Sequence, residues 1–318
     1  MTRQSGTSLV AGVLPFLAAL VLLATTAPSW GQPKEKEPEI PEPEAVKIEV
    51  KADLAKLPMI CTYYPSWLGK EAIPILMLHG YKGSRADYHY LATYLQQQGH
   101  AVIVPDLRGH GDSTVLNLAN GADKELLAEK MAKRDFEALV RDVNAIKSWI
   151  RQKNNDDELN MEMLTLVAAD MTCVTAMNFA MLDWNTKELL NYKNCRDVKA
   201  MVLLSPDQNY RGTSMQVAIK HPVVGHELSV MIAVGKKDSG ALSEAKRLVT
   251  TLERQHGESS DEKRGEEKEV VFYAADTNLQ GTDLVQKNLD VAPIVAKFIQ
   301  FRVQAFADKM EHTPRIQP

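Results

Sequence analysis

The hydrophobic pattern of this chain alternates between short apolar runs and longer amphipathic stretches. Eight runs are rich in Val, Ile and Leu, and the later ones are nearly continuous hydrophobic runs, which is typical of strands covered on both faces by helices. The alternation after residue 70 therefore predicts an α/β fold with a mostly parallel, eight-stranded sheet and helices on both faces. The predicted strands are residues 46–50, 59–64, 73–78, 101–105, 163–168, 198–204, 228–234 and 269–274.

Amphipathic stretches between these runs predict the helices. Apolar side chains recur at helical spacing from Phe136 to Ile150, which predicts a helix over residues 135–153 with one buried stripe. Ser84 is a suitable N-cap, and Gly99 a suitable stop, for a helix in between. The other predicted helices are residues 171–182, 239–255 and 291–307.

The amino-terminal 45 residues have a different composition from the rest. Residues 1–31 combine a basic start, an apolar run too short for a comfortable membrane span and small residues, which predicts an export signal peptide. The alternative is an uncleaved anchor, the one case in which we expect a membrane contact. Residues 32–45 are charged and proline-rich, so they predict a disordered linker. One domain is predicted over residues 46–308, followed by a polar tail over residues 309–318.

Charge and cysteine content narrow the function classes. The net charge of −4 gives no indication of nucleic-acid binding. The sequence has neither a ligand cluster with recognisable metal spacing nor a glycine-rich phosphate loop after a strand, so we predict no metal and no cofactor. The three cysteines, Cys61, Cys173 and Cys195, are expected to be mostly buried and free. A bridge from Cys195 to either of the others is the alternative.

Three motifs carry a resemblance to a known superfamily. The first is PILMLHGY at residues 74–81, the second is VIVPDLRGHGDS at residues 102–113, and the third is VGKKD at residues 234–238. In their order and spacing they resemble the α/β-hydrolase superfamily, in particular its compact esterase, dienelactone-hydrolase and serine-aminopeptidase-like members. The resemblance implies an α/β-hydrolase fold. Only residues 206–227 separate the sixth and seventh predicted strands, which is too short for a lid domain.

The same resemblance assigns three triad positions. The serine of the family's G-x-S-x-G turn falls on Asp170, the acid on Asp238 and the histidine on Gln280. A glutamine cannot take up a proton near neutral pH, so it cannot act as a general base. We expect Gln280 to face Asp238 or Asp170, and the two carboxylates to raise at least one pKa between them. The triad is therefore interpreted as degenerate.

The resemblance also places an oxyanion hole. Its two backbone amides would be those of Tyr81 and Met171, which need no particular side chain. His79 and Gly80 would form the oxyanion loop, with His79 in a structural, hydrogen-bonding role.

Asp170 itself has two interpretations. Haloalkane dehalogenases and epoxide hydrolases of this superfamily use an aspartate nucleophile, but a histidine-activated water releases their ester intermediate. As a structural residue, an aspartate tolerates the positive φ of such a turn and suits a helix amino terminus. A nucleophile displaced to Thr172, Cys173 or Thr175 is a further alternative, although helical spacing directs the last two into packing.

The leading hypothesis is an exported, lidless pseudo-hydrolase that binds a small-molecule ligand or a partner. The alternative is an active hydrolase of ester-like or other small substrates, with Asp170 as nucleophile and an unidentified base. The two hypotheses differ in whether an imidazole lies within hydrogen-bond reach of Asp170.

Overall fold

The computed structural model describes residues 38–52, 55–189, 192–257 and 269–315. The predicted signal peptide and the predicted linker up to residue 37 lie outside these residues. Within the described part of the chain, no helix is long and apolar enough to cross a membrane. Residues from Pro38 onward form one compact unit.

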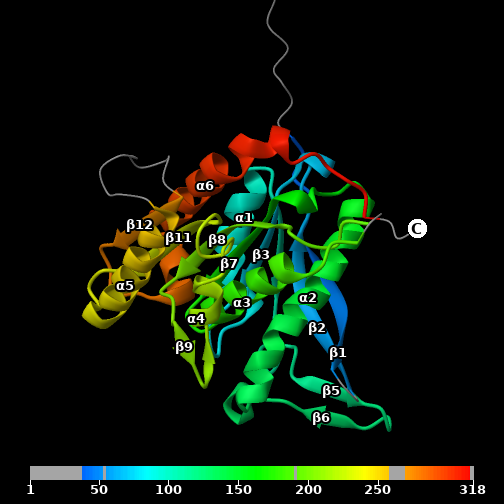
Figure 1. Ribbon diagram of the computed structural model, residues 1–318. Helices are drawn as coiled ribbons and strands as arrows, with labels where there is room; N and C mark the ends of the chain where they lie inside the picture. The colour runs from blue at the N-terminus through cyan, green and yellow to red at the C-terminus, as the bar shows by residue number, and fades with distance from the viewer. Residues whose placement is uncertain (1–37, 53–54, 190–191, 258–268, 316–318) are drawn as a thin grey trace, which may run out of the picture. The chain divides into compact units, whose positions relative to one another are not determined.

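A ten-stranded sheet forms the centre of this unit, in the order β12-β11-β8-β7-β3-β4-β2-β5-β6 with β1 paired to β2 (Figure 1). The five pairings from β12 to β4 are parallel, and those of β1, β2, β5 and β6 are antiparallel. The strands are β1 Glu44–Ala52, β2 Ala55–Tyr64, β3 Pro74–Leu78, β4 Ala101–Pro105, β5 Val115–Leu118, β6 Asp123–Glu125, β7 Leu164–Ala169, β8 Val198–Leu204, β11 Ser229–Gly235 and β12 Val270–Ala275. The eight predicted strands correspond to all of these except β5 and β6.

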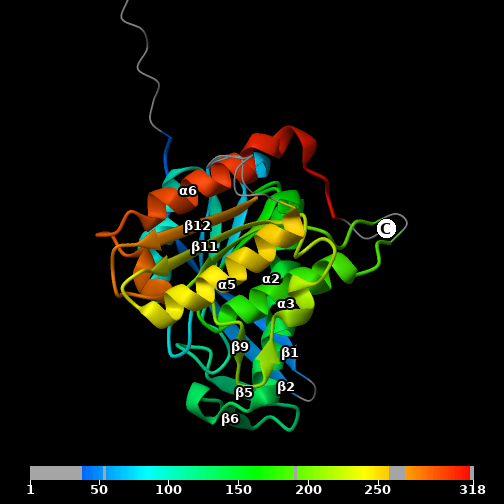
Figure 2. The same cartoon turned by 60° about the vertical axis from the view of Figure 1, so that its left-hand side comes forward.

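Helices cover both faces of the sheet, as the apolar runs predict (Figure 2). α1 and α6 pack on one face, and α2, α3 and α5 on the other. Alternate residues of β3 point to opposite faces. Ile75 and Met77 belong to the core on the side of α1 and α6, and Leu76 and Leu78 belong to the core on the side of α2, α3 and α5. The helices are α1 His89–Gln97, α2 Lys133–Asn155, α3 Thr172–Asn185, α4 Gln216–Ile219, α5 Ser239–His256 and α6 Val291–Arg302. The 3-10 turns are η1 Gly69–Glu71, η2 Arg85–Tyr88, η3 Ala128–Lys130, η4 Met161–Met163, η6 Gly281–Val285 and η7 Gln304–Lys309.

Two hairpins were not predicted from the sequence. The first, β5–β6, extends the sheet beyond β2, and the second, β9 (Asn209–Tyr210) with β10 (Thr213–Ser214), follows β8. The connection from β8 to β11 is described throughout and holds only this second hairpin and the one-turn α4. The three cysteines are buried and free, as expected.

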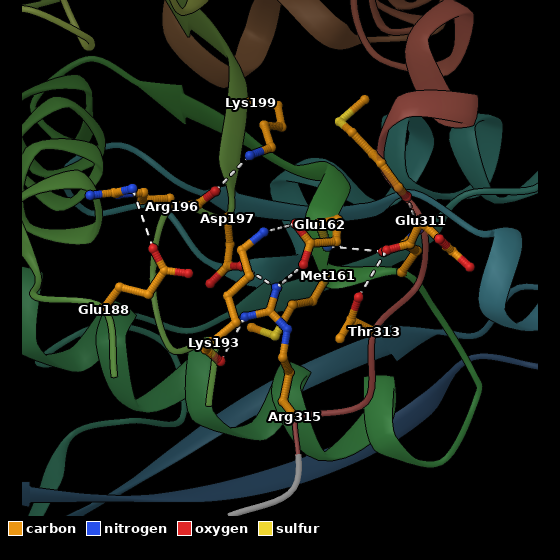
Figure 3. A network of polar contacts seen from close by, with 12 residues as sticks. Met161, Glu162, Glu188, Lys193, Arg196, Asp197, Lys199, Glu311, Thr313 and Arg315 are labelled. Atoms are coloured by element: carbon orange, nitrogen blue, oxygen red, sulfur yellow. Dashed lines mark hydrogen bonds and ion pairs between the residues drawn. The ribbon is translucent and has the colours of Figure 1, made fainter. Parts of the chain in front are cut away.

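The carboxyl-terminal tail is bound to the body of the domain through Arg315, which is only 2% exposed (Figure 3). Its guanidinium donates to Glu162 at 2.5 Å, to Asp197 at 2.6 Å and to the Lys193 carbonyl at 2.8 Å. Both carboxylates are buried and also pair with lysines, Glu162 with Lys193 and Asp197 with Lys147. Lys147 also pairs with the buried Asp183, so three cations meet three carboxylates, and Arg315 completes this network at the amino-terminal end of β7.

Replacing Arg315 should destabilise the fold. We expect Arg315→Ala to lower the free energy of unfolding by about 3 kcal/mol, the lower end for a broken buried ion pair, because each carboxylate keeps its lysine. Arg247→Ala is the matched control, since Arg247 forms only an exposed pair with Glu244 and should change stability by less than about 0.5 kcal/mol. Urea denaturation of the two variants measures the difference, and equal effects would contradict the structural role of the tail.

Candidate functional site

Asp170 occupies a sharp turn between the central strand β7 and helix α3. Its φ is +50°, in the left-handed region that aspartate tolerates better than most residues. The Asp170 amide donates to the Leu204 carbonyl at 2.9 Å, and its carbonyl accepts from the Asp207 amide at 3.3 Å. The turn is thus fixed against the end of β8. It has the position and the backbone conformation that the resemblance assigns to the nucleophile.

The Asp170 carboxylate fills the space between two loops. A Cβ added to Gly80, or to Gly281 at φ +54°, would lie 2.3 Å from Asp170 Oδ2. No hydrogen bond connects this carboxylate to any other described residue. Burial, followed by the charges of Asp207 and Asp283, raises the pKa of Asp170 to about 7. The site is therefore a crowded, acidic one in which Asp170 is only partly ionised near neutral pH.

The residues that follow the turn at Asp170, which we call the elbow, stabilise it. Thr172 is fully buried, and its hydroxyl bonds the Leu78 carbonyl at 2.9 Å and both the amide and the carbonyl of Ala169. Cys173 is fully buried, and burial raises the pKa of its thiol well above its usual value. Neither side chain has the exposure that a nucleophile needs. Thr175 is 5% exposed and makes no hydrogen bond with a described residue.

His79 fixes the loop that follows β3. Its Nδ1 donates to the Gly80 carbonyl at 2.8 Å, and its Nε2 accepts from the Leu107 amide at 3.1 Å. Burial lowers the pKa of His79 to about 4, so the ring is neutral and both nitrogens are used. These are the contacts of a structural histidine, and they fix the loop whose Gly80 lies against the Asp170 carboxylate.

Tyr81 also contacts the second hairpin through Arg211. The Arg211 guanidinium lies over the rings of Tyr81, Phe136 and Tyr210, with its carbon 4.8, 5.3 and 5.6 Å from their centres. It also donates to the Tyr81 hydroxyl at 3.1 Å. Arg211 itself has a φ of +44° and Gly212 a φ of +86°, as a tight two-residue hairpin turn requires. The hairpin is therefore clamped to the oxyanion loop, a contact that no sequence motif indicated.

Gln280 lies in the loop after β12, but it does not face Asp238 or Asp170 as expected. Its Oε1 accepts from the Ser205 hydroxyl at 2.6 Å and the Gly235 amide at 3.2 Å, and its Nε2 donates to the Gly235 carbonyl at 3.0 Å. The expected orientation of Gln280 was wrong because its side-chain amide pairs with both the amide and the carbonyl of one backbone residue, Gly235. Gln280 therefore fastens this loop to the ends of β8 and β11.

The side chain of Asp238 also has hydrogen-bond partners other than the expected ones. It caps α5 and accepts from the amides of Gly240 and Ala241 at 2.9 and 3.0 Å, and it is exposed. The carboxylates that raise the pKa of Asp170 are Asp207 and Asp283 instead. The expected coupling of Asp170 to Asp238 is corrected accordingly. Asp207 and Asp283 belong to no motif and come close to Asp170 only through the fold.

No imidazole is hydrogen-bonded or ion-paired to Asp170, although every histidine of the chain lies within the described ranges. The eight histidines are His79, His89, His100, His110, His221, His226, His256 and His312. His110, for example, bonds the Arg108 carbonyl, His226 the Gln255 carbonyl and His256 the Glu269 carboxylate. None is hydrogen-bonded or ion-paired to Asp170. Among the residues that the structure describes, there is also no cluster of His, Cys, Asp or Glu that could hold a metal ion.

Comparison with known proteins agrees with this architecture. The family described as alpha/beta hydrolase fold matches residues 73–217, which include β3, β4, β7 and the elbow. No curated protein matches the chain.

Several solved structures are similar in fold. A dienelactone hydrolase from Anabaena variabilis has a TM-score of 0.52 at 14% identity, over 83% of this chain and 99% of that one. An esterase from Pyrococcus furiosus has a TM-score of 0.53 at 14% identity, over 82% and 91%. A thermostable carboxylesterase from a metagenomic library has a TM-score of 0.56 at 13% identity, over 87% and 91%. The family match and the shared architecture together show that this chain has the α/β-hydrolase fold.

Proposed function

We propose that this chain is an exported pseudo-hydrolase, a catalytically impaired member of its fold class whose cleft binds a small-molecule ligand or a partner. One observation carries the proposal: no histidine is hydrogen-bonded or ion-paired to Asp170, and Gln280, to which the resemblance assigns the family's histidine position, is bound to Gly235 and Ser205. Export is proposed from the signal-like composition of residues 1–31.

The absence of a base at the elbow argues against turnover. Acyl transfer needs a group that takes a proton from the nucleophile or from water and returns it to the leaving group. Asp207 and Asp283 are the titratable groups that act on Asp170. Because they are carboxylates, they raise its pKa and do not stabilise a cationic partner.

The electrostatics of the cleft also determine which ligands fit. The charges of Asp207 and Asp283 act on Asp170, which occupies the turn where a serine hydrolase has its nucleophile, next to the site that stabilises an oxyanion. A developing negative charge would be repelled there, and so would an anionic ligand. We therefore propose that the cleft prefers neutral or cationic ligands.

An active hydrolase with Asp170 as nucleophile is the second candidate. The positive φ at Asp170 presents its carboxylate at the end of the sheet, as in a working elbow. The backbone amides of Tyr81 and Met171 do not bond this carboxylate, so they stay available for a substrate oxygen. Alkylation by an epoxide or alkyl halide would leave an ester on Asp170, and mass spectrometry of the peptide would detect it. Repeated turnover, with the ester forming and hydrolysing, would favour this candidate.

The mature protein should not react with a fluorophosphonate probe. The probe labels an activated serine or cysteine, and at this elbow the side chain is a carboxylate while Cys173 is buried. Short acyl esters should likewise be hydrolysed no faster than in buffer. An active serine esterase, labelled under the same conditions, is the control. Stoichiometric labelling at any residue of the cleft would show that a nucleophile exists and would refute the pseudo-hydrolase proposal.

Stability should depend on pH through Asp170. Its pKa is about 7 in the folded protein and close to 3.8 when unfolded, so the native state binds the extra proton between these values. The contribution of Asp170 to stability is therefore largest below about pH 4 and is lost as the pH rises through 7. Asp170→Asn removes it while keeping a residue that tolerates positive φ. We expect the stability of the wild type, relative to Asp170→Asn, to fall by on the order of 4 kcal/mol from pH 4 to pH 8.

Urea denaturation across this pH range measures the effect. Asp207→Asn serves as the comparison, because it removes a charge that raises the pKa of Asp170 and should move the transition to lower pH. If the difference in stability between the wild type and Asp170→Asn did not vary over this pH range, Asp170 would be ionised and solvated in the folded protein, and the prediction would be wrong.

A further inference from the structure

A pocket of about 270 Å³ lies beside α3, beneath the β9–β10 hairpin. Its walls come from α2, α3 and the hairpin, three segments that lie together in Figures 1 and 2. The lining residues are Phe136, Glu137, Val140, Val174, Thr175, Asn178, Gly212, Thr213 and Ser214. Asp170 is not among them, so the pocket is separate from the elbow, although Thr175 follows the elbow by only about one helical turn.

The polar wall contains a hydroxyl that has no hydrogen-bond partner in the described part of the protein and is accessible from the pocket. Thr175 is 5% exposed, lines the pocket and makes no hydrogen bond with any described residue. Three residues earlier, the fully buried Thr172 has partners for its hydroxyl, which accepts from the Ala169 amide and shares its one hydrogen between the Leu78 and Ala169 carbonyls. The Thr175 hydroxyl can therefore pair with a polar group bound in the pocket, and one such neutral hydrogen bond contributes about 1 kcal/mol. Asn178, on the same side of α3, uses its amide nitrogen for the Ser214 carbonyl and has its oxygen free for a ligand.

The opposite wall is apolar. Phe136 and Val140 stand four residues apart on α2, so they share one face, and Val174 of α3 completes the surface. The carboxylate of Glu137 at the same pocket disfavours an anion and already pairs with Lys133 at 3.5 Å. The pocket is larger than the roughly 150 Å³ cavity that holds benzene in another protein. Its chemistry therefore fits an uncharged molecule with a compact apolar body and one polar end.

We propose that this pocket binds a small neutral amphipathic molecule, namely a monocyclic aromatic or branched aliphatic alcohol or amide. Its apolar body packs on Phe136, Val140 and Val174, and its polar end pairs with Thr175 and Asn178. This site does not depend on any chemistry at Asp170. The Arg211 clamp on Phe136 and Tyr81 holds the hairpin over the pocket, so a ligand here contacts the same hairpin that braces the oxyanion loop.

Benzyl alcohol is the probe, and toluene is its counterpart without the hydroxyl. Titration of the isotope-labelled full chain, followed by amide shifts in NMR spectra, should show saturable benzyl alcohol binding with the largest shifts at Thr175, Asn178 and Gly212. Thr175→Val keeps the shape but removes the hydroxyl, and it should weaken benzyl alcohol binding about tenfold, the value of one neutral hydrogen bond, while leaving toluene binding unchanged. Thr175→Ser keeps the hydroxyl and should retain most of the affinity.

Thr93→Val is the matched control, because the Thr93 hydroxyl of α1, like that of Thr175, has no partner in the described structure but lies outside the pocket. It should leave benzyl alcohol binding unchanged. Val140→Phe, which fills the pocket from its apolar side, should abolish binding of both probes and keeps the test decisive if Thr175→Val does not fold. Shifts elsewhere on the protein, no saturable binding, or equal benzyl alcohol affinity in wild type and Thr175→Val would each overturn the proposal.

Discussion

The left-handed backbone of Asp170 is the constraint on which the rest of the site depends. It turns the chain from β7 into α3 and directs the carboxylate between the loops after β3 and β12. Each of these loops has a glycine where a Cβ would lie 2.3 Å from the carboxylate oxygen, at Gly80 and Gly281. The carboxylate and the two glycines are therefore one packing unit, and a side chain at either glycine would force a loop to move.

The fold could be predicted where the hydrophobic pattern is strong. Each of the eight predicted strands coincides with a strand to within a few residues at its ends. The central strands β3, β4, β7 and β11 are buried along their whole length, and such strands need a nearly continuous apolar run, whereas β1 and β2 alternate between buried and more exposed residues. The β5–β6 hairpin could not be predicted, since its strands are short and mostly exposed. The β9–β10 hairpin has an Arg211-Gly212 turn in place of the usual Asn-Gly, and its stability comes from rings that are distant in sequence, Tyr81 and Phe136.

At the site, the motifs predicted positions but not side-chain contacts. The elbow at Asp170 and the placement of Gln280 after the last strand follow from the order of the motifs. The partners of Gln280 do not, because the backbone of Gly235 is a neighbour only in the folded chain. For the same reason Asp238 was assigned to the cleft, whereas local geometry makes it the cap of α5. The acidic neighbours of Asp170 come from two loops whose sequences give no sign that they meet.

The packing around Asp170 and the charges near it favour the same protonation state of its carboxyl group. In a hydrolase, a cationic histidine would balance the charge near the elbow, whereas here that balance has to come from protonation of Asp170 itself. A neutral carboxyl packs against glycine at lower cost than a charged one, so the crowding at Gly80 and Gly281 and the raised pKa favour the same state. Gln280 and Thr172 then use their polar groups to fasten strands rather than to move protons. The elbow keeps the geometry of a catalytic turn, while the forces within it are those of a structural core.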